Sequence, residues 1–207
     1  MIDFTLSQLV MRICAVLVVS TLQGWATAAA AVVLGDKGPR HDGRLTIDPF
    51  RHVDLLGGAV GLIFAVGWSK WVVVDPRGLR AGRIGLLLVV AASFAALLLG
   101  ILVLRLMRPY ILPLLHDTAA ATVFQLIQTI IEMAVSFAIL GLLPLPPLPG
   151  GQLLIGLLPG WSGWLARMQL LFGAGIAALI ATGAAGGLLD PAVRSLMIVI
   201  LGEDVGM

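Results

Sequence analysis

The chain offers few side chains that could carry out chemistry. Its 207 residues include one cysteine, Cys14, and three histidines, His41, His52 and His116, which fall in polar loops or at the ends of apolar segments. A lone cysteine excludes an intrachain disulfide and a thiolate metal cluster. Nucleophilic and metal-assisted catalysis both need several such groups side by side. No cluster of histidine, cysteine and carboxylate falls within the apolar segments.

One carboxylate stands in the middle of an apolar segment. Glu132 follows Gln125 and Gln128 at seven and four residues, so the three side chains form one polar stripe on a helix. A carboxylate inside a membrane is costly and often marks a functional site. Three interpretations stay open: a hydrogen-bonded network inside the protein, a contact with a partner, and the handling of a proton or ligand. Arg12, also within an apolar segment, either pairs inside the protein or extends toward the membrane surface.

The elements that must position these groups are membrane helices. The chain is 59% hydrophobic and 12% charged, with a mean hydropathy of +1.06, and a bilayer span needs about 20 mainly apolar residues. The net charge of +2 gives no indication of nucleic-acid binding. Residues 1–207 are predicted to form a single all-α membrane domain, with a core over about 4–189 and an interfacial C-terminal segment over about 190–207. The predicted hydrophobic segments are Phe4–Leu34, Val53–Val74, Gly85–Leu106, Thr118–Leu143 and Trp164–Leu189, and Ser195–Leu201 is too short to cross.

The second hydrophobic segment, Val53–Val74, is interrupted by glycines and Lys70. If it crosses, lysine and arginine divide seven against six between the two faces; if it is re-entrant, they divide nine against four. The positive-inside rule favours the second arrangement. We therefore expect about four spans plus a re-entrant hairpin, with the long polar loops in the cytoplasm and the N-terminus outside. The alternating residues 43–48, "GRLTID", are predicted to form a small β element.

Three stretches, taken in order, resemble one known family. They are "LGDKGPRHDGRLTIDPFRHVDLLG" (34–57), "GWSKWVVVDPRGLR" (67–80) and "LLPLPPLPGG" (142–151). They are similar to GD…GRLTLNP…HIDPLG, GWAKPVPVNPRNLR and NLLPIPPLDGG in the compact bacterial site-2 proteases, which are intramembrane zinc metalloproteases. The resemblance runs from about Leu22 to Leu154. It implies that His52 and Asp54, which match HID, fasten the polar loop to the helix bundle.

The resemblance also implies that the zinc site is lost. The family binds zinc through the two histidines of HExxH and the aspartate of LDGG, and the glutamate of HExxH activates water. Gln23, Gly24, Thr27 and Pro149 correspond to these four residues. Gly141 corresponds to the family's asparagine ahead of LLP, and Ala96 to the asparagine that would steady the substrate backbone. None of the six keeps the family's residue, so we expect no zinc, no other cofactor and no catalysis. The resemblance places Thr27 and Pro149 at one depth, which also requires a re-entrant second segment.

The expected function is therefore binding in a bacterial inner membrane. We expect a multi-pass accessory, assembly or regulatory subunit whose partners are membrane lipid and other transmembrane proteins, with no nucleic acid. Two faces could contact a partner: the polar stripe, and a ridge of small residues formed by Gly173, Ala177, Ala181 and Ala185, for which internal packing is the alternative. Two other functions remain: small-molecule or lipid binding in a vacated cavity near Gln23, Thr27 and Glu132, and residual intramembrane proteolysis. A metal site of His41 and His52 is the alternative to a structural role for these histidines.

Overall fold

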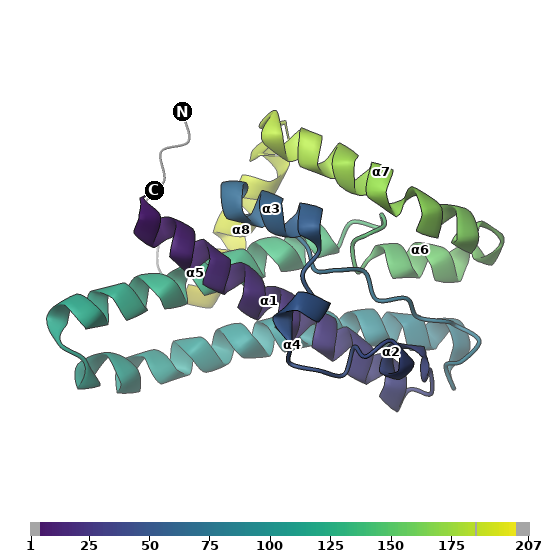
Figure 1. Ribbon diagram of the computed structural model, residues 1–207, viewed down its shortest axis with the longest axis horizontal. Helices are drawn as coiled ribbons and strands as arrows, with labels where there is room; N and C mark the ends of the chain where they lie inside the picture. The colour runs from purple at the N-terminus through teal and green to yellow at the C-terminus, as the bar shows by residue number, and fades with distance from the viewer. Residues whose placement is uncertain (1–4, 185, 202–207) are drawn as a thin grey trace.

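The computed structural model describes residues 5–184 and 186–201, which form a bundle of helices (Figure 1). Three helices are long and apolar enough to cross a membrane: α1 (Leu6–Val33), α4 (Gly82–Ile111), which the short turn η2 (Leu112–Leu114) extends, and α5 (Asp117–Gly141). The all-α membrane class predicted from the composition is confirmed.

The core lies where α1 crosses α4 and α5 (Figure 1). Its buried side chains come from all three helices and include Val19, Leu97, Ile131 and Phe137. Gly100 of α4 allows a close approach to α1, because a Cβ atom at this position would lie 2.6 Å from a Leu22 methyl group. Small residues at such crossings are typical of membrane helices, which gain stability mainly from close packing.

The polar loop after α1 contains α2 (Gly38–His41) and the turn η1 (Pro49–Arg51). The β element predicted over 43–48 is not seen. Among the described residues, β-type pairing is limited to one isolated bridge between Val53 and Ser69. The reason is that the loop's polar groups are already bonded elsewhere: the Thr46 carbonyl lies 2.8 Å from Nε2 of His52, and Arg44 Nη2 donates to the Trp71 carbonyl.

The second hydrophobic segment is a short helix followed by an extended return. α3 (Leu55–Phe64) begins at Asp54, whose Oδ1 accepts from the backbone N–H of Gly57, and ends at Ala65 with φ of 57°. Ten residues of helix measure about 15 Å, half of a bilayer core. The return packs closely on α3, since a Cβ atom on Gly67 would lie 2.4 Å from the Gly57 carbonyl oxygen.

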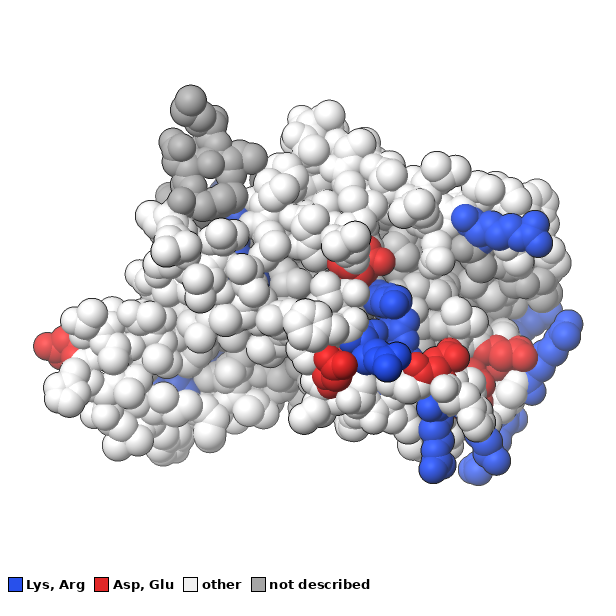
Figure 2. Space-filling model, in the orientation of Figure 1, with Lys and Arg blue, Asp and Glu red and all other residues white. Residues whose placement is uncertain are grey.

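The end of α1 and the approach to α4 meet at one point. The backbone N–H of Arg80 donates to the Leu34 carbonyl at 2.8 Å. The backbone N–H of Asp75 donates to Oδ2 of Asp36 at 2.9 Å. The whole excursion between these helices therefore begins and ends at the same end of the bundle. Figure 2 shows most of the visible lysine and arginine side chains toward this end of the molecule.

The C-terminal half differs from the sequence prediction in one respect. After a proline-rich hook (142–150) the chain forms α6 (Gly151–Leu157), η3 (Pro159–Trp161), α7 (Ser162–Ala181) and α8 (Gly186–Leu201). The prediction of one helix over Trp164–Leu189 is wrong, because α7 ends in a turn where Gly183 has a φ of 75°. The predicted short segment Ser195–Leu201 is the second half of α8, which packs on α5 through the buried Met197.

Candidate functional site

Three predicted site positions lie on the buried side of α1. Gln23 and Thr27 are almost inaccessible, whereas Trp25 between them is exposed. The side-chain oxygen of Gln23 accepts a hydrogen bond from the Ser69 hydroxyl at 2.8 Å. The Thr27 hydroxyl donates to the Gln23 backbone carbonyl at 2.7 Å. Both side chains are thus engaged in internal structure, one with the extended return and the other with α1 itself.

The third position, Gly24, faces the imidazole of His52. A Cβ atom built on Gly24 would lie 2.5 Å from Nδ1 of His52 and 3.1 Å from its Cγ. His52 is fully buried, and its backbone carbonyl accepts from the N–H of Lys70 at 2.7 Å. These contacts agree with the expected role of His52 in fastening the polar loop to the bundle. The imidazole also fills the space that a side chain at position 24 would need.

The protonation of His52 follows from its partners. A carbonyl oxygen can only accept, so Nε2, which lies 2.8 Å from the Thr46 carbonyl, carries the proton. Nδ1 is then an acceptor, and it has no partner among the described residues. Burial lowers the pKa of His52, the hydrogen bond to Thr46 opposes that shift, and the charge of Arg44 adds to it. His52 is therefore neutral near pH 7.

The hook is closed by backbone hydrogen bonds and apolar packing. Its backbone N–H at Gly150 donates to the Gly141 carbonyl at 2.8 Å, and Pro149 is buried. A Cβ atom on Gly141 would lie 3.1 Å from the Phe94 ring and 3.4 Å from Cδ of Pro149. Ala96 is half-buried on α4 and presents only a methyl group. None of these three positions offers a side-chain donor or ligand.

The C-terminal part of α1 and the chain after the hook converge on one apolar cluster. Ala28 of α1 packs with Val72 of the extended return and with Leu86 of α4, and Leu153 of α6 packs against the same cluster. Gln152 donates from Nε2 to the Val72 carbonyl at 2.9 Å. The extended return therefore connects α1 to α6, a role that its sequence did not reveal.

The donor set does not fit a zinc ion. Zinc takes Cys, His, Asp or Glu ligands, and the residues at the predicted ligand positions are Gln23, Thr27 and Pro149. Within residues 5–184 and 186–201, no three His, Cys, Asp or Glu side chains lie close enough to bind a metal ion. The predicted ligand positions are uncharged. Among the described residues, the buried side-chain atoms without a hydrogen-bond partner include Gln23 Nε2, Ser20 Oγ on the same helix and Ser93 Oγ on α4.

The polar stripe is only partly buried. Gln125 is exposed, whereas Gln128 and Glu132 are half-buried, and Gln128 Nε2 donates to Glu132 Oε1 at 3.1 Å. Arg12, the basic group that interacts electrostatically with Glu132, donates from Nη1 to the carbonyls of Leu62 and Ile63 at 2.9 and 2.7 Å. Arg12 therefore pairs inside the bundle and binds the C-terminal end of α3. No sequence pattern indicated this partner.

The ridge of small residues divides between interior and surface. Gly173 is buried beside Trp68, Leu56 and Pro147, and Ala177 is half-buried against the same part of the core. Ala181 is exposed, and Ala185 lies outside the described residues. Internal packing accounts for the first half of the ridge. The second half remains a predicted contact face.

Comparison with known proteins places this geometry in context. The protein named "Putative zinc metalloprotease YwhC" of Bacillus subtilis (strain 168) is 30% identical over 143 residues, which are 67% of this chain and 65% of that protein. The match supports a site-2 protease-like relationship. The chain spans a little less than two thirds of that relative's length. No protein-family profile matches the chain, and no solved structure matches it.

Proposed function

We propose that the chain is a non-catalytic, site-2 protease-like membrane protein that acts by binding other transmembrane proteins as an accessory, assembly or regulatory subunit. The observation that carries this proposal is the contact between Gly24 and His52. Gly24 stands where the resemblance places the glutamate that activates water, and the imidazole of His52 takes up the adjoining space.

Zinc-dependent peptide hydrolysis needs a bound metal, an activated water and a general base. The amide of Gln23 is bonded to Ser69, and the hydroxyl of Thr27 is bonded to its own helix. Pro149 has no side-chain ligand atom. With neither the ligands nor the base, the chain would retain the fold of a protease without its reaction.

We propose that the chain crosses the bacterial inner membrane four times, through α1, α4, α5 and α7, and that α3 with its return is re-entrant. The hydrogen bond from Arg80 to Leu34 supports this arrangement, because it keeps both ends of the 35–79 excursion at one end of the bundle. α7 has 20 residues and measures about 30 Å, the thickness of a bilayer core, although its apolar part, Arg167–Ala181, is shorter than in the other three helices. The long polar loops would then lie in the cytoplasm.

A partner that is itself a membrane helix would suit the outer side of α7. Leu170, Leu171 and Leu179 are exposed there, and Ala181 adds a small residue at the far end. Small residues allow close approach between helices, which lipid does not otherwise drive together.

The experiment that tests this function is gentle extraction of the tagged chain from its native membrane, followed by identification of the proteins that remain bound. A stoichiometric transmembrane partner that Ala181→Leu releases would support the proposal. Ser195→Ala, an exposed position on α8, serves as the control. Recovery of cleaved membrane peptides with the purified chain, and of no intact partner, would contradict it.

A second candidate is the binding of a small polar molecule or lipid in the former site. Unpartnered buried atoms on Ser20, Gln23 and Ser93 favour it, because buried polar groups usually have a partner or an ordered water. Mass spectrometry of the extracted chain would detect such a ligand. A ligand that Gln23→Leu releases would support this candidate.

A further inference from the structure

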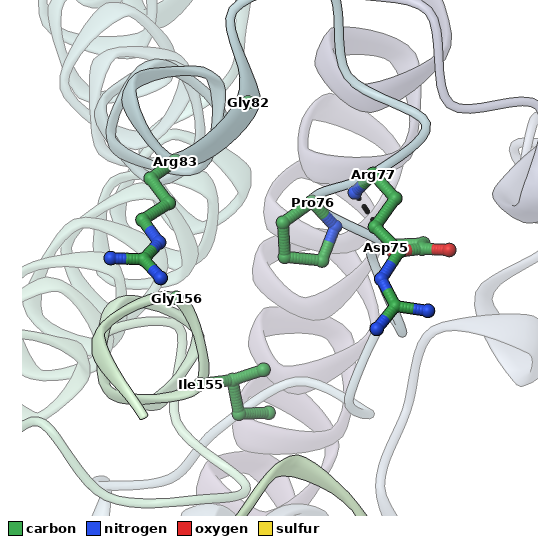
Figure 3. Close-up of a pocket in the computed structure, with 7 residues that line it drawn as sticks. All are labelled: Asp75, Pro76, Arg77, Gly82, Arg83, Ile155 and Gly156. Carbon is green, nitrogen blue, oxygen red and sulfur yellow. Dashed lines mark hydrogen bonds between the residues drawn. The ribbon is translucent and has the colours of Figure 1, made fainter. Parts of the chain in front are cut away.

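A cleft that carries two arginine side chains lies at the start of α4. It has a volume of about 510 Å³ and lies between the 75–83 segment and the C-terminal end of α6 (Figure 3). Arg77, in the loop before α4, and Arg83, in the first turn of α4, line the cleft. Ile155 and Gly156 of α6 form its apolar wall. Figure 3 shows the guanidinium group of Arg83 beside Gly156 and that of Arg77 on the other side of Pro76. The two groups therefore lie on opposite sides of the space.

The two arginines are available to a ligand. Both are exposed, and neither side chain makes a hydrogen bond or ion pair with any residue that the structure describes. Asp75 is the one acidic residue of the lining, and its Oδ1 already accepts the backbone N–H of Arg77 at 2.9 Å. The lining therefore has a net positive charge, with two guanidinium groups that can each form paired hydrogen bonds to a phosphate.

The position of the cleft indicates which class of phosphate-containing ligand it would bind. α4 is the most apolar of the candidate spans, and the cleft lies at its first residues, where a spanning helix leaves the bilayer. Directly beyond Arg83, the exposed side chains of α4 are Ile84, Leu87 and Leu88. A ligand bound by the arginines would thus have its polar group in the cleft and an apolar surface beside it. A phospholipid has both a phosphate group for the cleft and acyl chains for the apolar surface, whereas a soluble phosphate has only the first.

We propose that this cleft binds the phosphodiester headgroup of an anionic phospholipid, with its acyl chains along α4. The bound lipid would join the 75–83 segment to α6. That segment is already fixed to the end of α1, through Asp75 with Asp36 and Arg80 with Leu34. The lipid therefore stabilises the end of the bundle at which the polar loops emerge. This inference does not depend on whether the chain is catalytic.

The test uses the full chain purified in a neutral detergent and titrated with phosphatidylglycerol or phosphatidylcholine, with binding read by native mass spectrometry. We expect one phosphatidylglycerol per chain, bound at least fivefold more tightly than phosphatidylcholine. The double variant Arg77→Gln/Arg83→Gln should bind it about thirtyfold more weakly, because each basic residue near an anionic lipid contributes about a factor of five. The control Lys37→Gln/Arg40→Gln removes the same charge from exposed positions in the polar loop after α1. It should change binding less than about twofold.

A third variant, Ile155→Trp, keeps both arginines and fills the cleft, so it should weaken binding severalfold. Thermal melting without lipid checks that each variant is folded. Equal binding by the double arginine variant and the wild type would overturn the proposal, as would an equal loss in the Lys37/Arg40 control, which would indicate diffuse surface charge. Glycerol 3-phosphate that displaces the lipid at equal concentration would show a site for soluble phosphates and would overturn it as well.

Discussion

A methyl group on Gly24 would lie 2.5 Å from Nδ1 of His52, closer than two such atoms can approach. The two residues are 28 positions apart in the sequence and belong to α1 and to the polar loop. Their contact fixes the loop against the first helix and leaves no space for a longer side chain at position 24. A glutamate at position 24 would therefore fit only if His52 moved.

The first prediction concerns this contact. Gly24→Ala should lower the free energy of unfolding by about 1–3 kcal/mol, because an inserted methyl group overpacks a filled site. Gly175→Ala is the matched control, since a Cβ atom there meets nothing within 4 Å and alanine favours a helix interior by about 0.5–1 kcal/mol. Chemical unfolding in detergent measures both. If Gly24→Ala is as stable as Gly175→Ala, the contact with His52 is not present in solution.

The pH dependence of stability should report the buried imidazole. Burial lowers the pKa of His52 in the folded state, whereas the unfolded value is about 6.5. Above pH 6.5 both states are neutral and His52 adds no pH dependence. As the pH falls below 6.5 the unfolded state takes up the proton first, so stability decreases until the folded pKa is passed.

The measurement is the unfolding midpoint in detergent between pH 5 and 8. His52→Gln should remove much of the decrease on the acidic side, although it also lowers stability at every pH. His41→Gln is the control, because His41 is exposed on α2. An acidic decrease that persists unchanged in His52→Gln would assign the effect to other groups.

Arg12 should stabilise the C-terminal end of α3. Its Nη1 donates to the carbonyls of Leu62 and Ile63, which have no further helical turn to bond them. Arg12→Met keeps the apolar stem and removes both bonds, at a cost of about 1–2 kcal/mol. Hydrogen exchange of the amides at 62–66 should become faster, whereas Arg105→Met, at an exposed position of α4, should leave it unchanged. Identical exchange in the two variants would refute the capping role.

The re-entrant arrangement predicts which residues share a face of the membrane. In a chain with Cys14 replaced by Ser, single cysteines at Arg44 and Arg80 should react with an impermeant thiol reagent from the same side. A cysteine at His116, between α4 and α5, should react from the other side and serves as the control. Labelling of positions 44 and 80 from opposite sides would show that the second segment crosses.

The long helices were predictable because their signal is local. α1, α4 and α5 each fill a continuous apolar run, whereas the second segment breaks at Ala65 and not at Gly57, Gly58 or Gly61, which lie inside α3. The break after Ala181 was missed because Gly183 lies in a run of small residues that resembles a packing face. The strand over 43–48 was wrong because alternation does not show whether a partner strand exists, and here His52 and Arg44 bond the loop instead.

The contacts of the candidate site could not be predicted from the sequence. The spacing from Leu34 selects Gln23, Gly24 and Thr27 as candidate positions, and the structure places all three on α1. Their partners, Ser69 and His52, are distant in sequence, so only the fold brings them together. The bond from Arg12 to the end of α3 is of the same kind, since backbone acceptors have no sequence signature.

The measurement that tests the central claim most directly is the zinc content of the purified full chain, taken by elemental analysis after washing with a chelator, together with an assay of a membrane-segment substrate. The account predicts zinc far below one ion per chain and no cleavage above that of a mock preparation. One zinc ion per chain that resists the chelator, with cleavage that Gln23→Leu abolishes, would contradict it.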